Sequence, residues 1–185
     1  MTKQNSIGED IRALRNTRKM RLTELAERLQ CSVGWLSQVE RDISTPSQAV
    51  LEQISDVFEV PSSIFFEKGT VPDREKGRIV RAENRRAFGE RVDGLVESLI
   101  SPDLTDSFEM IHSVFQPETS RDEIVQRPTQ ELAYIVSGRL DVWIDGEAFT
   151  LGAGDSLRIR GEPFRWANPY KKPVVAIWVI SPPVY

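Results

Sequence analysis

Five cationic side chains lie close together near the start of the chain, and their chemistry suits the binding of phosphate groups. The set comprises Arg12, Arg15, Arg18, Lys19 and Arg21. Cations that neutralise phosphates supply most of the sequence-independent affinity of proteins for DNA. A solvated helix face produces the same clustering, and from charge alone that interpretation is preferred. What the cluster does therefore depends on the elements that position it.

The net charge of −4 resides in the C-terminal part of the chain. Residues 92–185 carry 14 acidic and 8 basic side chains, whereas residues 1–66 carry 9 and 8. Between them, residues 67–91 carry 8 basic and 5 acidic side chains. The distribution of charge matters more than its sum for a nucleic-acid partner. A DNA-binding role for residues 1–66 therefore stays open.

The composition is that of an ordinary soluble protein, with 39% hydrophobic and 28% charged residues among 185. This length allows one large domain or two modest ones. No apolar run approaches the roughly 20 residues of a membrane helix, and residues 1–8 lack the apolar region of a secretory signal. We therefore expect a cytoplasmic protein with no membrane partner. The single cysteine, Cys31, is expected to be a small buried hydrophobic residue rather than a redox sensor.

Apolar residues recur at helical spacing throughout residues 1–66, and the pattern predicts a bundle of five short helices. Thr23 and Ser32 are the expected N-caps of the second and third helices, because their hydroxyl groups can accept hydrogen bonds from the first helical turn. The predicted helices begin near residues 7, 24, 33, 47 and 61, and the third ends at about residue 41.

The pattern changes to period two after a charged segment, residues 67–76, that is predicted to be a linker. Residues 77–185 are predicted to form an antiparallel β-barrel of the jelly-roll kind or a sandwich, because short strands alternate there with glycine and proline. The dipeptide Asp145-Gly146 between two apolar runs predicts a hairpin turn. The expected strands are 78–81, 95–100, 109–115, 132–136, 140–144, 148–151, 156–159, 164–167 and 174–180.

The most specific local signal is LTELAERLQCSVGWLSQVE, residues 22–40. Two short helices joined by a tight turn and covered by further helices form a helix-turn-helix unit. The stretch resembles the phage-repressor or XRE-type family, whose members continue with a Glu-Arg pair and a Pro-Ser helix start, here Glu40-Arg41 and Pro46-Ser47. The resemblance covers about residues 7–66. It departs from the family pattern at Gln30, where glycine usually ends the second helix.

This resemblance implies that the third helix reads bases in the major groove of double-stranded DNA. It also implies a structural ion pair between Arg15 and Glu40. Gln38 could form two hydrogen bonds with adenine, and Val33 could contact a thymine methyl group. Gly34 would allow the helix to approach DNA closely; alternatively, glycine is simply tolerated near the start of a helix. The expected base readers are Val33, Gly34, Trp35, Ser37 and Gln38, and the expected phosphate contacts are Arg21, Thr23 and Arg41.

The chain from about residue 109 resembles the cupin family of strand-rich barrels, which often hold a metal. The resemblance rests on ELAYIVSGRLDVWIDGEAFTLGAGDSLRI, residues 131–159. In metal-binding cupins three histidines and a glutamate are the ligands, and the corresponding positions here are Val125, Arg127, Glu131 and Phe164. Imidazole and carboxylate are what transition metals require, so we expect no metal and no cofactor. The only histidine, His112, is expected to be an ordinary partly buried residue.

The same positions suggest what a barrel without a metal could bind. Glu131 and Arg127 offer opposite charges, and Phe164 and Trp166 alternate on a strand to give aromatic surface. These four residues are the predicted ligand site. They suit a small effector carrying both charges, such as an amino acid or an amine. Alternatively, Arg127 and Glu131 pair with each other and the barrel is filled.

Taken together, the two resemblances predict a transcription regulator of two domains that is not an enzyme. The barrel is expected to form a homodimer, which places the readers on an inverted-repeat operator, and to sense a small-molecule effector. One alternative is a metal-dependent cupin enzyme with an accessory helical domain. Another is a barrel that only dimerises the DNA reader.

Overall fold

The computed structural model describes residues 7–65, 72, 74–102 and 104–184, and the chain divides into two compact units. One unit comprises residues 1–86 and 101–106, and the other residues 87–100 and 107–184. Much of the predicted linker lies outside the described residues, so the predicted boundaries 1–66, 67–76 and 77–185 stay a prediction. The helical unit nevertheless includes Arg86 and the segment 101–106, which the sequence did not indicate.

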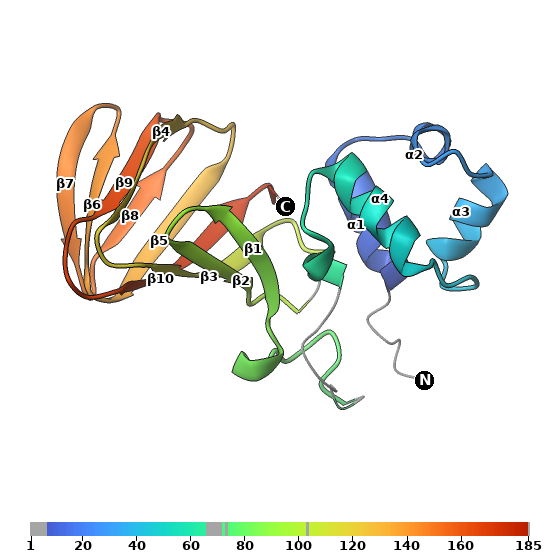
Figure 1. The fold of residues 1–185 in the computed structure, drawn as a ribbon, viewed down its shortest axis with the longest axis horizontal. Helices are drawn as coiled ribbons and strands as arrows, with labels where there is room; N and C mark the ends of the chain where they lie inside the picture. Colours follow the sequence, from blue (N-terminus) through green and yellow to red (C-terminus); the bar gives the residue numbers. More distant parts are fainter. Residues whose placement is uncertain (1–6, 66–71, 73, 103, 185) are drawn as a thin grey trace. The chain divides into compact units, whose positions relative to one another are not determined.

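Four α-helices form the described part of the helical unit, with α4 beside α1 (Figure 1). The apolar faces predicted from helical spacing provide its core, since Ile11, Leu14, Leu36 and Ile54 are fully buried. The helices are α1 (Ile7–Thr17), α2 (Leu22–Arg28), α3 (Val33–Val39) and α4 (Gln48–Phe58), followed by the 3-10 helix η1 (Ser62–Phe65).

Local capping explains where α3 and α4 begin. Ser32 Oγ accepts a hydrogen bond from the Trp35 amide at 3.1 Å, as predicted, and Ser47 Oγ accepts one from Val50 at 3.4 Å. Gln30 adopts the left-handed conformation, with φ of 53°, where the family usually has glycine. The strain does not prevent the tight turn between α2 and α3.

Three expectations for the helical unit were wrong. The N-cap of α2 is Arg21, without a side-chain hydrogen bond, so Thr23 lies inside the helix. The predicted fifth α-helix is only the 3-10 turn η1, because one turn after Pro61 already buries Ile64 and Phe65. Cys31 is half-buried rather than fully buried, and its partial burial raises the pKa of the thiol.

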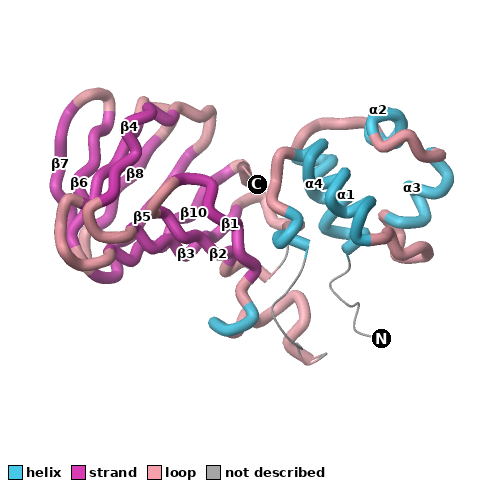
Figure 2. The backbone as a smooth tube through the Cα atoms, in the orientation of Figure 1, coloured by secondary structure: helices cyan, strands magenta, loops and turns pink. Residues whose placement is uncertain are grey.

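The second unit consists of two antiparallel sheets (Figure 2). The six-stranded sheet has the order β1-β2-β3-β10-β5-β8, and the four-stranded sheet has the order β4-β9-β6-β7. The strands are β1 (Arg86–Val92), β2 (Leu95–Leu99), β3 (Glu109–Phe115), β4 (Thr119–Val125), β5 (Gln130–Ser137), β6 (Arg139–Ile144), β7 (Glu147–Gly152), β8 (Ser156–Ile159), β9 (Phe164–Asn168) and β10 (Val174–Ser181).

The β-barrel expected for residues 77–185 is not closed, whereas the sandwich alternative agrees with the two sheets. Closure requires hydrogen bonds all the way around, whereas the strand pairs of the described residues stop at β1 and β8 in one sheet and at β4 and β7 in the other. Buried and less buried residues alternate along β3, β5 and β10. One face of the six-stranded sheet thus belongs to the core, as in a two-sheet sandwich.

The strand predictions failed where side chains are mostly polar. Residues 78–81 form turn and coil, and β1 and β4 were not predicted. In β4, whose sequence is TSRDEIV, no residue is fully buried, so the strand has no period-two pattern of apolar residues to detect. The predicted hairpin turn is confirmed: Asp145 and Gly146 both have positive φ, and Ile144 pairs with Glu147.

A buried ion pair in the helical unit joins segments far apart in sequence. Arg86 Nη1 donates to Asp10 Oδ2 at 2.6 Å, and the Leu104 amide donates to Asp10 Oδ1 at 3.2 Å. Arg86 Nη1 also donates to the Ile64 carbonyl at 3.1 Å. Asp10 is 2% exposed and Arg86 is 6% exposed. One carboxylate of α1 thus fixes both chain segments that flank the β1–β2 hairpin.

Asp10→Asn is expected to destabilise the helical unit strongly, because it removes the carboxylate charge from a buried ion pair with Arg86. Loss of one partner from a buried pair costs about 3–5 kcal/mol. Urea unfolding of the full chain, followed by far-ultraviolet circular dichroism, measures the change. Glu24→Gln is the matched control, since it removes an exposed ion pair with Arg28 that is worth at most about 1 kcal/mol. Equal effects of the two variants would contradict the role of Asp10.

Candidate DNA interface and ligand pocket

The face of α3 that the sequence assigned to base reading is accessible. Val33, Gly34 and Gln38 are exposed, and Trp35 and Ser37 are half-buried. Leu36 and Val39 are fully buried on the opposite side of the helix, as predicted. The helix therefore presents its predicted readers on one face while the other anchors it to the helical unit.

Gln38 is held by a neighbour that the sequence did not identify. Ser44 Oγ donates to Gln38 Oε1 at 3.1 Å, and the amide of Ile43 donates to the Gln38 carbonyl at 2.9 Å. Arg41 is exposed, and its Nε donates to the Ser37 carbonyl at 3.0 Å. The turn after α3 thus orients a side-chain amide and a guanidinium near the reading face.

The remaining phosphate candidates, Arg21 and Thr23, are exposed at the start of α2. Their exposure is compatible with contact to DNA phosphates, and that contact stays a prediction.

The predicted Arg15–Glu40 ion pair is confirmed. Arg15 Nε and Nη2 donate to the two carboxylate oxygens of Glu40 at 2.6 and 2.9 Å, and Nη1 donates to the Met20 carbonyl at 2.9 Å. The hydrogen bond to Glu40 raises the pKa of Arg15, opposed by burial. Because Glu40 is the C-cap of α3, this bidentate pair fixes the end of the reading helix to α1.

A close backbone contact holds the same two helices together. The Gly8 amide donates to Asp42 Oδ1 at 3.0 Å, and a Cβ atom at Gly8 would lie 2.1 Å from the Val39 carbonyl oxygen. Only glycine allows this approach. Gly34 differs, since a Cβ atom there would meet nothing within 4 Å. The fold of the protein therefore does not require glycine at position 34.

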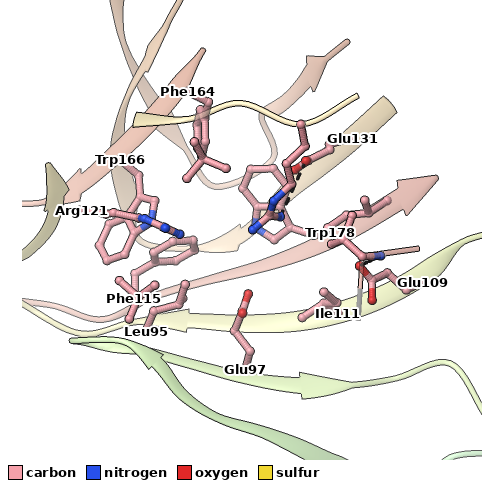
Figure 3. Close-up of a pocket in the computed structure, with 15 residues that line it drawn as sticks. Leu95, Glu97, Glu109, Ile111, Phe115, Arg121, Glu131, Phe164, Trp166 and Trp178 are labelled. Atoms are coloured by element: carbon pink, nitrogen blue, oxygen red, sulfur yellow. Dashed lines mark hydrogen bonds and ion pairs between the residues drawn. The ribbon is translucent and has the colours of Figure 1, made fainter. Parts of the chain in front are cut away.

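In the second unit, a cavity of about 230 Å³ is lined by residues of both sheets (Figure 3). The four predicted ligand residues, Arg127, Glu131, Phe164 and Trp166, all line it. Its aromatic walls are ordered by edge-to-face contacts: Phe115 lies 4.7 Å from Trp166, and Phe164 lies 5.6 Å from Trp178, between ring centroids. The structure thus brings the predicted residues together, and their binding of a ligand stays a prediction.

The cavity does not have the donors of a metal site. The four positions that correspond to cupin ligands, Val125, Arg127, Glu131 and Phe164, all line it, but only Glu131 is a possible ligand. Within the part of the chain that the structure describes, no three His, Cys, Asp or Glu side chains are grouped as metal ligands. His112 is half-buried and alternates with the buried Ile111 and Ser113, so it faces away from this interior.

The two predicted charged residues, Arg127 and Glu131, lie near each other without a direct hydrogen bond. Arg127 Nη1 lies 4.0 Å from Glu131 Oε1, and Thr129 Oγ1 donates to the same oxygen at 2.9 Å. This contact agrees with the alternative that Arg127 and Glu131 neutralise each other. It does not fill the cavity.

Sequence reasoning missed several residues of the cavity, above all Glu97, Glu109, Arg121 and Trp178. Trp178 and Glu109 lie at buried positions of β10 and β3, so the period-two pattern contained a signal for them. Arg121 lies on β4, which no pattern predicted. Arg121 lines the cavity because β4 pairs with β9, where Arg121 is opposite Trp166.

Comparison with known proteins gives both halves of the chain a family. Residues 6–63 match the model of a helix-turn-helix domain, and residues 111–180 match that of a cupin domain. The chain belongs to the helix-turn-helix transcription regulators that carry a cupin domain. By this membership it is a DNA-binding regulator. None of the described helices is long and apolar enough to cross a membrane.

Named relatives are transcription regulators. The chain is 24% identical to the HTH-type transcriptional regulator PuuR of Escherichia coli K12, over 87% of this chain and 86% of PuuR. It is 28% identical to the regulator SutR of the same strain, over 84% and 83%. It is 30% identical to the immunity repressor protein of Bacillus phage phi105, over 49% of this chain and 69% of the repressor.

Gly34→Ala separates the two interpretations of this glycine. Because a methyl group fits without contact and alanine favours the helix, the free energy of unfolding is expected to rise by up to about 1 kcal/mol. If Gly34 permits close approach to DNA, the affinity for operator DNA falls in the same variant. Urea unfolding and fluorescence anisotropy with labelled DNA measure the two quantities. Unchanged affinity would mean that glycine is merely tolerated here.

Proposed function

We propose that the protein is a dimeric transcription regulator that reads an inverted-repeat DNA site with α3 and senses a small molecule in the sheet-lined cavity. The observation that carries the proposal is α3 itself. Its base-reading candidates are accessible, whereas Leu36 and Val39 are buried and the Arg15–Glu40 pair fixes its end. A rigid helix with accessible polar side chains is what base recognition in the major groove requires.

Gln38 is the residue proposed to specify sequence, and Arg41 the one proposed to position the protein on the phosphate backbone. The contact from Ser44 supports this role for Gln38, because a side chain already held in place loses less entropy on binding. Val33 is 41% exposed and supplies apolar surface for a thymine methyl group. Trp35, Ser37, Arg21 and Thr23 complete the proposed interface.

Gln38→Ala is expected to change the preferred base at one position of each half-site, at a cost of about 1–3 kcal/mol for the original base. Arg41→Ala is expected to weaken binding to all sequences and to reduce the salt dependence of binding by about one counterion. Selection from randomised DNA and salt-titrated anisotropy distinguish these effects. Gln48→Ala, an exposed glutamine on α4, is the matched control. Binding without sequence preference in the unaltered protein would contradict the proposal.

Dimerisation is proposed to use the outer face of the six-stranded sheet, defined by the outward residues of β3, β10 and β5. Leu132, Tyr134 and Val136 are each about half exposed there. The outward positions of the three strands carry no Lys, Arg, Asp or Glu. On a two-fold axis a patch meets its own copy, so any charge would face a like charge. A largely apolar face without Lys, Arg, Asp or Glu, on which His112 is the histidine of β3, is therefore suited to a second copy of this chain.

Tyr134→Lys is expected to convert the dimer to a monomer, because two buried lysines would meet across the interface. Light scattering after size exclusion measures the mass. DNA affinity should fall with it, since the two recognition helices of a dimer engage half-sites about 34 Å apart. Phe149→Lys changes a comparably exposed aromatic residue on β7 of the other sheet and should leave the dimer intact. A dimeric Tyr134→Lys protein would place the interface elsewhere.

The cavity is proposed as the effector site. It combines aromatic walls with opposite charges, as the predicted site of Arg127, Glu131, Phe164 and Trp166 requires, and a small molecule carrying both charges, such as an amino acid or an amine, suits it. A ligand that binds only the folded unit stabilises it, by about 2.7 kcal/mol at a hundredfold excess over its Kd.

A further inference from the structure

We propose that Arg121 and Glu97 recognise the two charges of the effector, which is a small zwitterion with a carboxylate and an amine. This assignment rests on the effector role proposed above. It replaces Arg127 and Glu131 as the charge-selecting pair and leaves them in the wall of the same cavity. Arg121 binds the carboxylate, and Glu97 binds the ammonium group.

Arg121 has donors that its present contacts do not use. It enters the cavity from β4, beside Trp166 and Phe115 (Figure 3). Its Nη2 donates to Glu123 at 2.9 Å, but Glu123 is 78% exposed, so this ion pair is weak. Its Nε is buried and has no hydrogen-bond partner among the residues that the structure describes. A carboxylate bound side-on would satisfy Nε and a neighbouring Nη together.

Glu97 offers the complementary anion from β2. It lies opposite Ser113 of β3, and the buried Ser113 hydroxyl donates to Glu97 Oε1 at 2.9 Å. This bond orients the carboxylate, and a carboxylate accepts several hydrogen bonds. Glu97 can therefore accept protons from an ammonium group while it keeps Ser113. In Figure 3 its carboxylate extends from its strand toward the same space as Arg121.

Three other charged groups, Arg127, Glu131 and Glu109, line the same cavity. Arg127 and Glu131 lie within 4.0 Å of each other, and Thr129 donates to Glu131. Glu109 accepts the Val184 amide at 3.0 Å. A ligand that engaged Arg127 or Glu131 would compete with their mutual attraction. The Nε of Arg121 has no hydrogen-bond partner among the described residues to give up, so a ligand carboxylate is favoured at Arg121.

The cavity also limits the size of the ligand. Its volume, about 230 Å³, is below the roughly 300–1,000 Å³ of common ligand pockets. Phe115 contacts Trp166 edge-to-face beside Arg121, so the middle of the ligand lies against aromatic carbon. A short aliphatic chain between the two charges meets this requirement. Free amino acids have this chemistry.

Isothermal titration calorimetry of the full chain tests the assignment with two probe sets. One set is the common α-amino acids. The other is a four-carbon series, 4-aminobutanoate, butanedioate and butane-1,4-diamine, which differ in charge but little in length. The unaltered protein is expected to bind one or more zwitterions and to bind the dianion and dication of matched length more weakly.

Arg121→Gln and Glu97→Gln are expected to weaken binding of the zwitterion by about tenfold or more, since each removes a charge-assisted hydrogen bond. They should also alter selectivity in opposite directions. Loss of Arg121 favours amines without a carboxylate, and loss of Glu97 favours carboxylates without an amine. A merely structural defect would not reverse selectivity. Arg121→Lys keeps the charge but loses the paired donors, and should bind with intermediate affinity.

Arg160→Gln and Glu147→Gln, which alter exposed side chains outside the cavity, are the matched controls and should not change the Kd. Zwitterion binding that is lost in Arg127→Gln or Glu131→Gln but kept in Arg121→Gln and Glu97→Gln would overturn the assignment and leave the effector role intact. Absence of binding by the unaltered protein to every probe would contradict the effector role as well.

Discussion

The buried carboxylate of Asp10 is the group on which the arrangement of segments within the helical unit depends. It is buried on α1, and both of its oxygens accept hydrogen bonds, one from Arg86 and one from the Leu104 amide. Desolvating two charges offsets most of their attraction, so such a pair adds little net stability against an apolar alternative. Its effect is to specify position. The chain leaves the helical unit at Arg86 and returns at Ser101, and one side chain holds both segments.

Between these two segments the chain forms β1 and β2, which belong to the sheet unit. Strand β2 carries Leu95 and Glu97 into the cavity. Strand β2 supplies Glu97, the proposed ammonium-binding group. The β1–β2 hairpin is flanked in sequence by Arg86 and by Leu104, and both of these residues contact Asp10 of α1. The same helix carries Arg15, whose pair with Glu40 fixes the end of α3. Two ion pairs of α1 thus join distant segments within the helical unit.

The cavity illustrates how a fold can keep a site while its chemistry changes. The four positions that bind metal in related cupins converge here as well, but Val125 and Phe164 make the interior apolar and Arg127 neutralises Glu131. A Lewis-acid site needs several lone-pair donors at one point. The described side chains instead supply opposite charges and aromatic walls, which suit a ligand recognised by charge and shape. The function of this cavity therefore depends on its own side chains rather than on the cupin fold.

The sequence by itself determined what depends on neighbours along the chain. Helical spacing placed the core of the helical unit, Ser32 marked the start of α3, and Asp145-Gly146 marked the β6–β7 turn. Resemblance added the Arg15–Glu40 pair and the positions of Arg127, Glu131, Phe164 and Trp166 around one cavity. These signals are local or belong to a motif, so they can be detected without coordinates.

Only the tertiary structure decided the contacts between distant segments. Asp10 and Arg86 are 76 residues apart, and no pattern near either residue indicates the other. Strands β1 and β4 have few buried apolar residues, so only pairing with β2 and β9 defines them. Whether the sheets close into a barrel depends on hydrogen bonds between their edges, which side-chain periodicity does not encode. Arg121 and Glu97 meet one cavity for the same reason: they come from different sheets, and only packing brings their charges together.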